Sequence, residues 1–135
     1  MQLSAKNHLR LHRYVGILSV ILLFSRPFLF HFWEWNPLSP EILSLYVGRI
    51  GVVLGALAFF TGGGLGKYLS EEKSRTAEIH TILMLGGLIL QVPILAEAGT
   101  SIFLNILSYF GYLFLFSGWI LGRRVFRNRK RILPF

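Results

Sequence analysis

Four long apolar stretches, separated by short polar segments, dominate the pattern of hydrophobic and polar positions along the chain. They cover approximately residues 14–33, 41–65, 77–98 and 102–122. Each reaches the ~20 residues that an α-helix needs to cross the hydrocarbon core of a bilayer. None alternates regularly between apolar and polar residues, as the strands of a membrane barrel do. The pattern therefore predicts an all-α, integral membrane protein that folds as a four-transmembrane-helix bundle.

Chain length limits what else the protein can contain. The 135 residues are 53% hydrophobic, and the mean hydropathy is +0.57. Nearly all of them lie in the predicted spans, so we expect residues 1–135 to form a single membrane domain without a soluble domain. The first span leads into Ser25-Arg26-Pro27 rather than into a small-residue cleavage site, which predicts a retained helix and not a signal peptide. A functional site must then lie between helices or at their ends.

Basic residues are distributed unevenly between the two sides of the predicted bundle. Twelve of the fourteen Lys and Arg fall in the N-terminal segment, the middle loop and the C-terminal tail, and none falls in the other two turns. The positive-inside rule therefore predicts that both termini are cytoplasmic. We expect a multi-pass protein of the bacterial inner membrane or an organellar equivalent. The net charge of +8 is then a topology signal: it favours contact with anionic lipid headgroups at the cytoplasmic face and not nucleic-acid binding.

The composition also excludes several chemistries. The chain has no cysteine and no aspartate, and its six glutamates lie at predicted helix ends or in the middle loop. Thiolate ligands, cysteine nucleophiles and a carboxylate site at mid-bilayer are therefore not expected. No catalytic constellation is recognisable, so the sequence favours a protein that is not an enzyme and predicts no metal site built from carboxylates or thiolates.

Small residues line one face of the second span. They recur every three or four residues, which places them in one helical stripe: Ser44, Gly48, Gly51, Gly55, Ala58 and Gly62. Such a stripe allows another helix to approach closely, either from this chain or from another subunit. Spans one and three carry polar stripes instead, which should face the bundle interior or a partner: His8, His12, Gly16, Ser19 and Arg26 on the first, and Ala77, His80, Met84, Gly87 and Gln91 on the third. No internal sequence repeat is evident.

Two arginines lie inside the apolar stretches. Arg26 and Arg49 are each about 10 Å below the extracytoplasmic boundary if the helices rise ~1.5 Å per residue. A guanidinium in hydrocarbon is costly and usually has a partner or a function. One interpretation is that each side chain reaches outward to the headgroups. The other is an anion- or lipid-binding site that both arginines share, completed by Gln91, Glu97 or Asn105 from the third and fourth helices.

Two histidines form a rival site. His12 and His80 lie near the cytoplasmic ends of the first and third helices, on faces that also carry glycine. Two such imidazoles can hold a b-type haem, although two histidines at this spacing are not a specific motif. Their expected depths differ by about a turn and a half, however, which strains ligation of one iron by both residues. Histidines at a membrane boundary also contact headgroups or backbone carbonyls without any cofactor.

These observations favour a non-catalytic accessory or assembly subunit of a larger integral-membrane complex, because the chain has glycine-lined packing faces and almost no extramembrane mass. Its partners would be the lipid bilayer and other membrane subunits or further copies of itself. A haem b- or quinone-binding electron-transfer subunit that uses His12 and His80 is the alternative. A small oligomeric transporter with an arginine-lined anion site is the third hypothesis.

Overall fold

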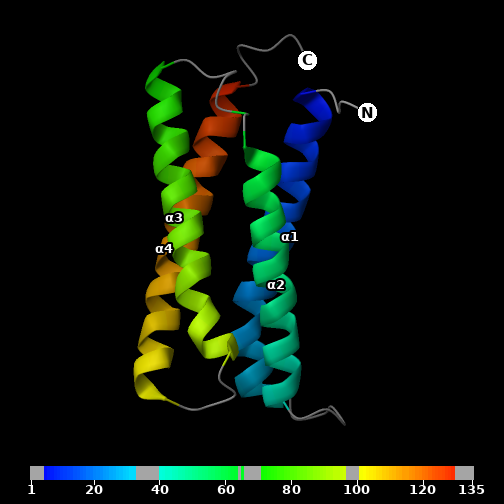
Figure 1. The fold of residues 1–135 in the computed structure, drawn as a ribbon, viewed down its shortest axis with the longest axis vertical. Helices are drawn as coiled ribbons and strands as arrows, with labels where there is room; N and C mark the ends of the chain where they lie inside the picture. The colour runs from blue at the N-terminus through cyan, green and yellow to red at the C-terminus, as the bar shows by residue number, and fades with distance from the viewer. Residues whose placement is uncertain (1–4, 33–39, 64, 66–70, 97–100, 130–135) are drawn as a thin grey trace.

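Four long helices make up the computed structural model, which describes residues 5–32, 40–63, 65, 71–96 and 101–129. They are α1 (Ala5–Phe32), α2 (Pro40–Gly62), α3 (Glu71–Ala96) and α4 (Ile102–Arg129). Each contains a stretch of at least 22 residues that is long and apolar enough to cross a membrane. The helices run alternately in opposite directions, so α1 begins and α4 ends at the same end of the bundle (Figure 1). The prediction of an all-helical protein with four candidate spans is confirmed.

The helices extend beyond the apolar stretches that predicted them. α1 begins at Ala5, α3 begins at Glu71 and α4 continues to Arg129. The added turns are rich in Arg, Lys and Glu, which are good helix formers but lower the hydropathy. A hydropathy window therefore detects the part of a helix that suits hydrocarbon, whereas backbone hydrogen bonding continues into the polar residues at the membrane surface.

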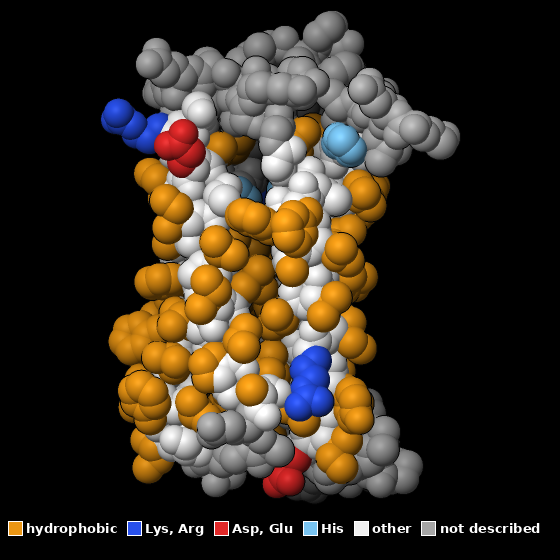
Figure 2. Space-filling view, in the orientation of Figure 1, with side chains coloured by type: hydrophobic (Ala, Val, Ile, Leu, Met, Phe, Trp, Pro, Cys, Tyr) orange, Lys and Arg blue, Asp and Glu red, His pale blue; other side chains and the backbone are white. Residues whose placement is uncertain are grey.

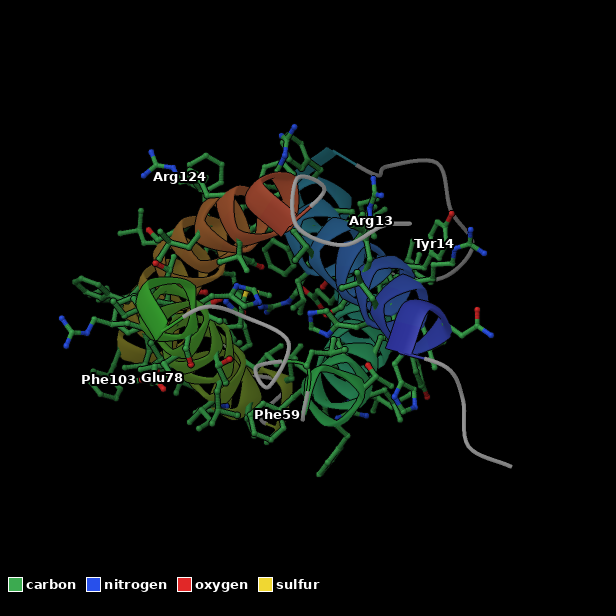
Figure 3. The ribbon with its side chains drawn as sticks, turned by 90° about the horizontal axis from the view of Figure 1, so that it is seen from above. Arg13, Tyr14, Phe59, Glu78, Phe103 and Arg124 are labelled. Atoms are coloured by element: carbon green, nitrogen blue, oxygen red, sulfur yellow. The ribbon has the colours of Figure 1, made fainter. Side chains whose placement is uncertain are left out.

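The bundle is built from two antiparallel hairpins. α1 packs along α2 to form the first hairpin, and α3 packs along α4 to form the second, whereas α2 and α3 contact each other much less. Seen from above, the four helices stand at the corners of a rough square, with the first hairpin beside the second (Figure 3). We call the end at which α1 begins the terminal end, and the other end the opposite end. The boundary between the hairpins runs the length of the molecule.

Glycine determines how closely the helices approach within each hairpin. A Cβ atom on Gly51 would lie 2.9 Å from Cγ of Leu23 and 3.3 Å from its backbone nitrogen, so α1 crosses α2 with no room for a side chain. In the second hairpin, a Cβ atom on Gly87 would lie 2.9 Å from the carbonyl oxygen of Gly111. Close packing of this kind stabilises helix pairs in lipid, where apolar burial gives no advantage.

Large apolar side chains mostly cover the outside of the bundle, as Figure 2 shows. The interior holds a few fully buried residues, among them Leu23 and Leu115 at 0% exposure, together with small and polar groups. Figure 3 shows Tyr14, Phe59 and Phe103 pointing away from the bundle. This distribution, apolar outside and polar in part inside, suits a protein surrounded by lipid. The polar groups of the interior are therefore the candidates for function.

Candidate functional site

His12 of α1 is held by the other helix of its own hairpin. Its Nδ1 atom lies 2.8 Å from the carbonyl oxygen of Ala58 on α2. Its ring lies over Gly62, where a Cβ atom would be 2.8 Å from Cε1 of the imidazole. A carbonyl oxygen only accepts hydrogen bonds, so Nδ1 donates and the neutral ring keeps Nε2 as an unprotonated nitrogen. Ala58 and Gly62 were predicted as packing residues, and the structure shows that they seat a histidine.

His80 of α3 occupies the equivalent position in the second hairpin. Its Nδ1 atom lies 2.7 Å from the carbonyl oxygen of Gly118 on α4. A Cβ atom on Gly122 would lie 2.8 Å from Cε1 of this ring. The hydrogen bond again assigns a proton to Nδ1, so in the neutral ring Nε2 keeps its lone pair. Each hairpin thus presents one imidazole, oriented by a backbone carbonyl and seated on a glycine.

The two hairpins therefore repeat one arrangement, although no repeat is evident in the sequence. His12 corresponds to His80, Ala58 to Gly118, and Gly62 to Gly122. Each arrangement needs only a histidine, a residue that supplies the carbonyl oxygen and a glycine, so the other residues of the two hairpins can differ. A comparison of residue identities does not detect a repeat of this kind, because most of the matched positions only need to be small.

The boundary between the hairpins brings the two histidines together. Their ring centroids are 6.3 Å apart, and the ring planes are perpendicular. The expected difference in depth of a turn and a half does not keep the two rings apart, since they are in contact in the structure. Two imidazoles that bind one metal ion from opposite sides, each at about 2 Å, have ring centres roughly 6 Å apart. The observed separation matches that spacing.

The donor set also limits the kind of metal centre. Among the described residues, no group of three or more His, Cys, Asp or Glu side chains is close enough to hold a metal ion. Two imidazoles alone do not complete the coordination of zinc or of a bare transition metal. They do complete that of a haem iron, whose four other ligands come from the porphyrin. Two imidazoles are therefore a donor pair that suits a haem iron better than a metal ion without further ligands.

The two arginines lie toward the opposite end and reach across the boundary between the hairpins. Nη1 of Arg26 on α1 donates to Oγ of Ser108 on α4, at a distance of 3.5 Å. Nε of Arg49 on α2 donates to the carbonyl oxygen of Leu95 in the last turn of α3, at 3.1 Å. The two guanidinium groups thus have acceptors on different helices. Their joint anion site stays a prediction, and Arg49, which is exposed, is accounted for as a cap of α3.

Of the two described residues expected to complete that site, Gln91 lies in a buried polar cluster and Asn105 does not. Gln91 is 0% exposed, and it donates from Nε2 to the carbonyl oxygen of Ser108 at 2.8 Å. The Ser108 hydroxyl donates in return to Oε1 of Gln91 at 2.7 Å. Asn105 is exposed, and Glu97 lies outside the described residues.

Two atoms of this region are buried without a hydrogen-bond partner. They are Nε of Arg26 and the hydroxyl oxygen of Tyr112 on α4. The Tyr112 hydroxyl interacts with both Arg26 and Ser108, although neither contact has the regular geometry of a hydrogen bond. Sequence reasoning missed Ser108 and Tyr112 as site residues. Ser108 does carry a signal in the sequence, because it recurs at helical spacing with the small residues Gly111, Gly118 and Gly122 of α4. Tyr112 is one of many aromatic residues and carries no distinguishing signal.

Similarity to known proteins adds no further constraint to this geometry. No protein-family model matches the chain, and neither the curated proteins nor the solved structures include one that is significantly similar to it.

Proposed function

We propose that the protein binds one b-type haem between its two hairpins, with His12 and His80 as the axial ligands, and that it transfers electrons within the membrane. The observation that carries this proposal is the pair of perpendicular imidazoles with centroids 6.3 Å apart. The hydrogen bonds from Nδ1 to backbone carbonyls support it, because they leave each Nε2 free to bind iron.

The architecture of the bundle supports the same proposal. Close packing is concentrated within the hairpins, and the boundary between them is the natural plane for a flat cofactor. Cofactor sites in helical bundles are commonly built in this way, from side chains on helices that face each other. A haem in that plane would contact the first hairpin with one face and the second with the other.

Each histidine also has the second partner that axial ligands typically require. A hydrogen bond from Nδ1 to a carbonyl oxygen fixes the tautomer and the ring orientation, and it makes Nε2 a stronger electron donor toward iron. Stronger donation favours the ferric state, so Ala58 and Gly118 would lower the reduction potential of the haem through their carbonyl groups. With His12 and His80 both as ligands, the haem would have no open position for oxygen, and the chemistry it would supply is one-electron transfer.

The case for an accessory subunit is weaker than the sequence indicates. That expectation rested on the small extramembrane mass, the absence of a recognisable catalytic constellation and a small-residue stripe with an unknown partner. Inside this chain the stripe is already covered: Gly55 by Ser19 and Leu88, Gly51 by Leu23, and Gly48 by Leu95. The stripe therefore gives no reason to expect a second subunit on that face.

Orientation in the membrane is part of the proposal. We infer from the distribution of basic residues that the terminal end, and with it the histidine pair, faces the cytoplasm. Because the chain has no cysteine, single cysteines at Ser74 and Ser101 are clean probes. An impermeant thiol reagent added to intact cells should label Ser101→Cys and leave Ser74→Cys unmodified. The reverse pattern would place the histidine pair on the outer side.

Visible absorption spectroscopy tests the haem directly. The purified protein should show a Soret band and the sharp α and β bands of a reduced six-coordinate b-type haem. Either His12→Ala or His80→Ala should abolish this spectrum, because each removes an axial ligand. His8→Ala, one turn before His12 on α1, is the matched control and should retain it. Purified, folded protein without haem, or equal haem content in all three variants, contradicts the proposal.

A further inference from the structure

Arg49 is a charged residue on a surface that otherwise suits hydrocarbon. It is the only basic residue of α2, it lies within the candidate span Glu41–Gly62, and it is exposed. Its neighbours on the same face of the helix are large, mostly apolar and 46% to 59% exposed: Ile42, Tyr46 and Val53. Figure 2 shows a basic patch over the lower part of α2, with hydrophobic side chains around it. The guanidinium group is therefore open to lipid.

One hydrogen bond restrains this guanidinium group. Nε donates to the carbonyl oxygen of Leu95 at 3.1 Å, and α3 ends one residue later at Ala96. A guanidinium group has five N–H donors, and this bond uses one of them. Because Nε is held, the edge formed by Nη1 and Nη2 keeps a definite direction. Two parallel N–H donors on one edge match two oxygens of a phosphate or a carboxylate.

The described residues around Arg49 supply little negative charge to balance it. In the half of the bundle toward the opposite end, the described parts of the four helices hold one acidic residue, Glu41. It precedes Arg49 by eight positions, or about 12 Å along α2. The carbonyl oxygen of Leu95 carries only a partial charge. Since a full positive charge at this depth is costly without a counter-ion, the site calls for an anion from outside the described helices.

We propose that Arg49 binds the phosphate group of an anionic phospholipid in the leaflet at the opposite end of the bundle. The bilayer itself supplies this anion, and a long side chain reaches toward the headgroups from a depth of about 10 Å. The phosphate meets Nη1 and Nη2, and the acyl chains lie along the exposed apolar face of α2. A zwitterionic lipid carries its own cation beside the phosphate, so an anionic lipid complements the charge of Arg49 better. The site is independent of the haem.

The position of the site gives the bound lipid a structural effect. Arg49 reaches from the first hairpin to the second, and α2 and α3 contact each other much less than the two helices of either hairpin do. A phosphate that neutralises the guanidinium group removes the cost of keeping it beside Leu95. Because the lipid binds the folded bundle, it should also raise the unfolding temperature by mass action. The lipid therefore stabilises the association of the two hairpins.

Native mass spectrometry of the purified protein measures the binding of single lipid molecules. The probe is dioleoylphosphatidylglycerol, and dioleoylphosphatidylcholine, with the same acyl chains, should bind about tenfold more weakly. Arg49→Gln should weaken the tightest phosphatidylglycerol site by about tenfold, because the fork of donors is lost. Arg124→Gln removes an exposed charge that points away from the terminal end of the bundle (Figure 3) and should leave that site unchanged. Equal affinity for the two lipids, or equal losses in the two variants, overturns the proposal.

A second pair of variants tests the site without removing Arg49 or its bond to Leu95. Tyr46 lies one turn nearer the opposite end, on the same face of α2. Tyr46→Glu places a carboxylate beside the guanidinium group, so it should displace the phosphate and weaken phosphatidylglycerol binding by about tenfold. Tyr46→Gln makes a similar change without the charge and should retain the lipid. Equal affinity in these two variants contradicts the proposed site.

Glu97 is the competing counter-ion within the chain. It is outside the described residues and follows Leu95 by two positions in the sequence. Glu97→Gln should leave phosphatidylglycerol affinity unchanged, because the lipid phosphate is the partner of Arg49. A gain in affinity of about tenfold in this variant would show that the Glu97 carboxylate already neutralises Arg49, and the proposal would then be wrong.

Discussion

The terminal end and the opposite end connect the two hairpins in different ways. At the terminal end, His12 and His80 each hydrogen-bond to a carbonyl oxygen within their own hairpin. Toward the opposite end, Arg26 and Arg49 each hydrogen-bond to an acceptor in the other hairpin. The arginines thus join the halves directly. The histidines face each other across the boundary without a hydrogen bond between them.

The hydrogen bonds of the arginines thus hold the bundle together, whereas the arrangement of the histidines suits the binding of a ligand. A side chain whose hydrogen bond crosses the boundary uses its donor to hold the two hairpins together. A histidine whose ring is oriented by a carbonyl of its own hairpin keeps the other ring nitrogen for a ligand placed between the hairpins. We therefore expect substitutions near the histidines to affect mainly cofactor binding and substitutions near the arginines to affect mainly stability.

The largest expected effect comes from filling the space beneath a histidine ring. In Gly62→Ala the new Cβ atom would lie 2.8 Å from Cε1 of His12, so the ring must move. Displacing an axial ligand from its second partner should lower haem affinity by roughly 10- to 100-fold. Haem titration into apoprotein measures the change. Gly16→Ala is the matched control, because its Cβ atom meets Ala58 at an ordinary 3.7 Å; equal losses in both variants would contradict the assigned role of Gly62.

The corresponding change toward the opposite end should weaken the fold and spare the cofactor. In Gly48→Ala the new Cβ atom would lie 2.5 Å from Cδ2 of Leu95 and 3.1 Å from Cδ of Arg26. Overpacking of this kind costs about 1–3 kcal/mol of unfolding free energy. Unfolding in mixed detergent micelles measures it, and haem affinity should change less than twofold. A tenfold loss of haem affinity in Gly48→Ala would remove the distinction between the two ends.

A smaller effect is expected from the buried pair that joins α3 to α4. Gln91→Leu removes both hydrogen bonds to Ser108 and leaves the serine hydroxyl without its acceptor. Hydrogen bonds between membrane helices contribute roughly 0.6–1.7 kcal/mol, so we expect a loss of about 1–2 kcal/mol in the same unfolding assay. Thr81→Val removes an exposed hydroxyl that bonds within its own helix and serves as the control. Equal stability of the two variants would show that the pair contributes nothing.

The smallest effect concerns the coupling of the two arginines. Because Arg26 and Arg49 bond to different helices, the losses of Arg26→Gln and Arg49→Gln should add within about 0.5 kcal/mol in the double variant. A shared anion predicts the opposite, since the second substitution would then cost little after the first. Unfolding of the two single variants and the double variant distinguishes these cases. Strong non-additivity would restore the paired anion site.

Periodicity in the sequence predicted the parts of this arrangement that depend on one helix at a time. It gave the four spans, the stripe of α2 that contains Gly51 and Gly55, and the inward face of α3 that contains His80 and Gln91. The ends of the helices were harder to predict, because polar helix formers at residues 5–13 and beyond Gly122 lower the hydropathy without ending the helix.

The relation between the hairpins could not be predicted from periodicity. Depth was counted from the edges of the apolar stretches, and this placed His12 and His80 at different levels. Their actual register depends on how one hairpin packs against the other, which involves residues far apart in the chain. The same limit hid the Tyr112 hydroxyl, whose place beside Arg26 and Ser108 is a property of the assembled interior. For the same reason, the sequence could not predict that Arg26 and Arg49 donate to Ser108 and to the Leu95 carbonyl.

Low-temperature electron paramagnetic resonance of the oxidised, purified protein tests the central claim most directly. One haem per chain, held by two imidazoles in perpendicular planes as the rings are here, predicts a low-spin ferric signal of the strongly anisotropic kind. Pyridine haemochrome analysis of the same sample should give one haem b per chain and none after His12→Ala or His80→Ala. A high-spin signal alone, or a folded protein that takes up no haem when haem is supplied, would contradict the claim that the two hairpins meet around an iron centre.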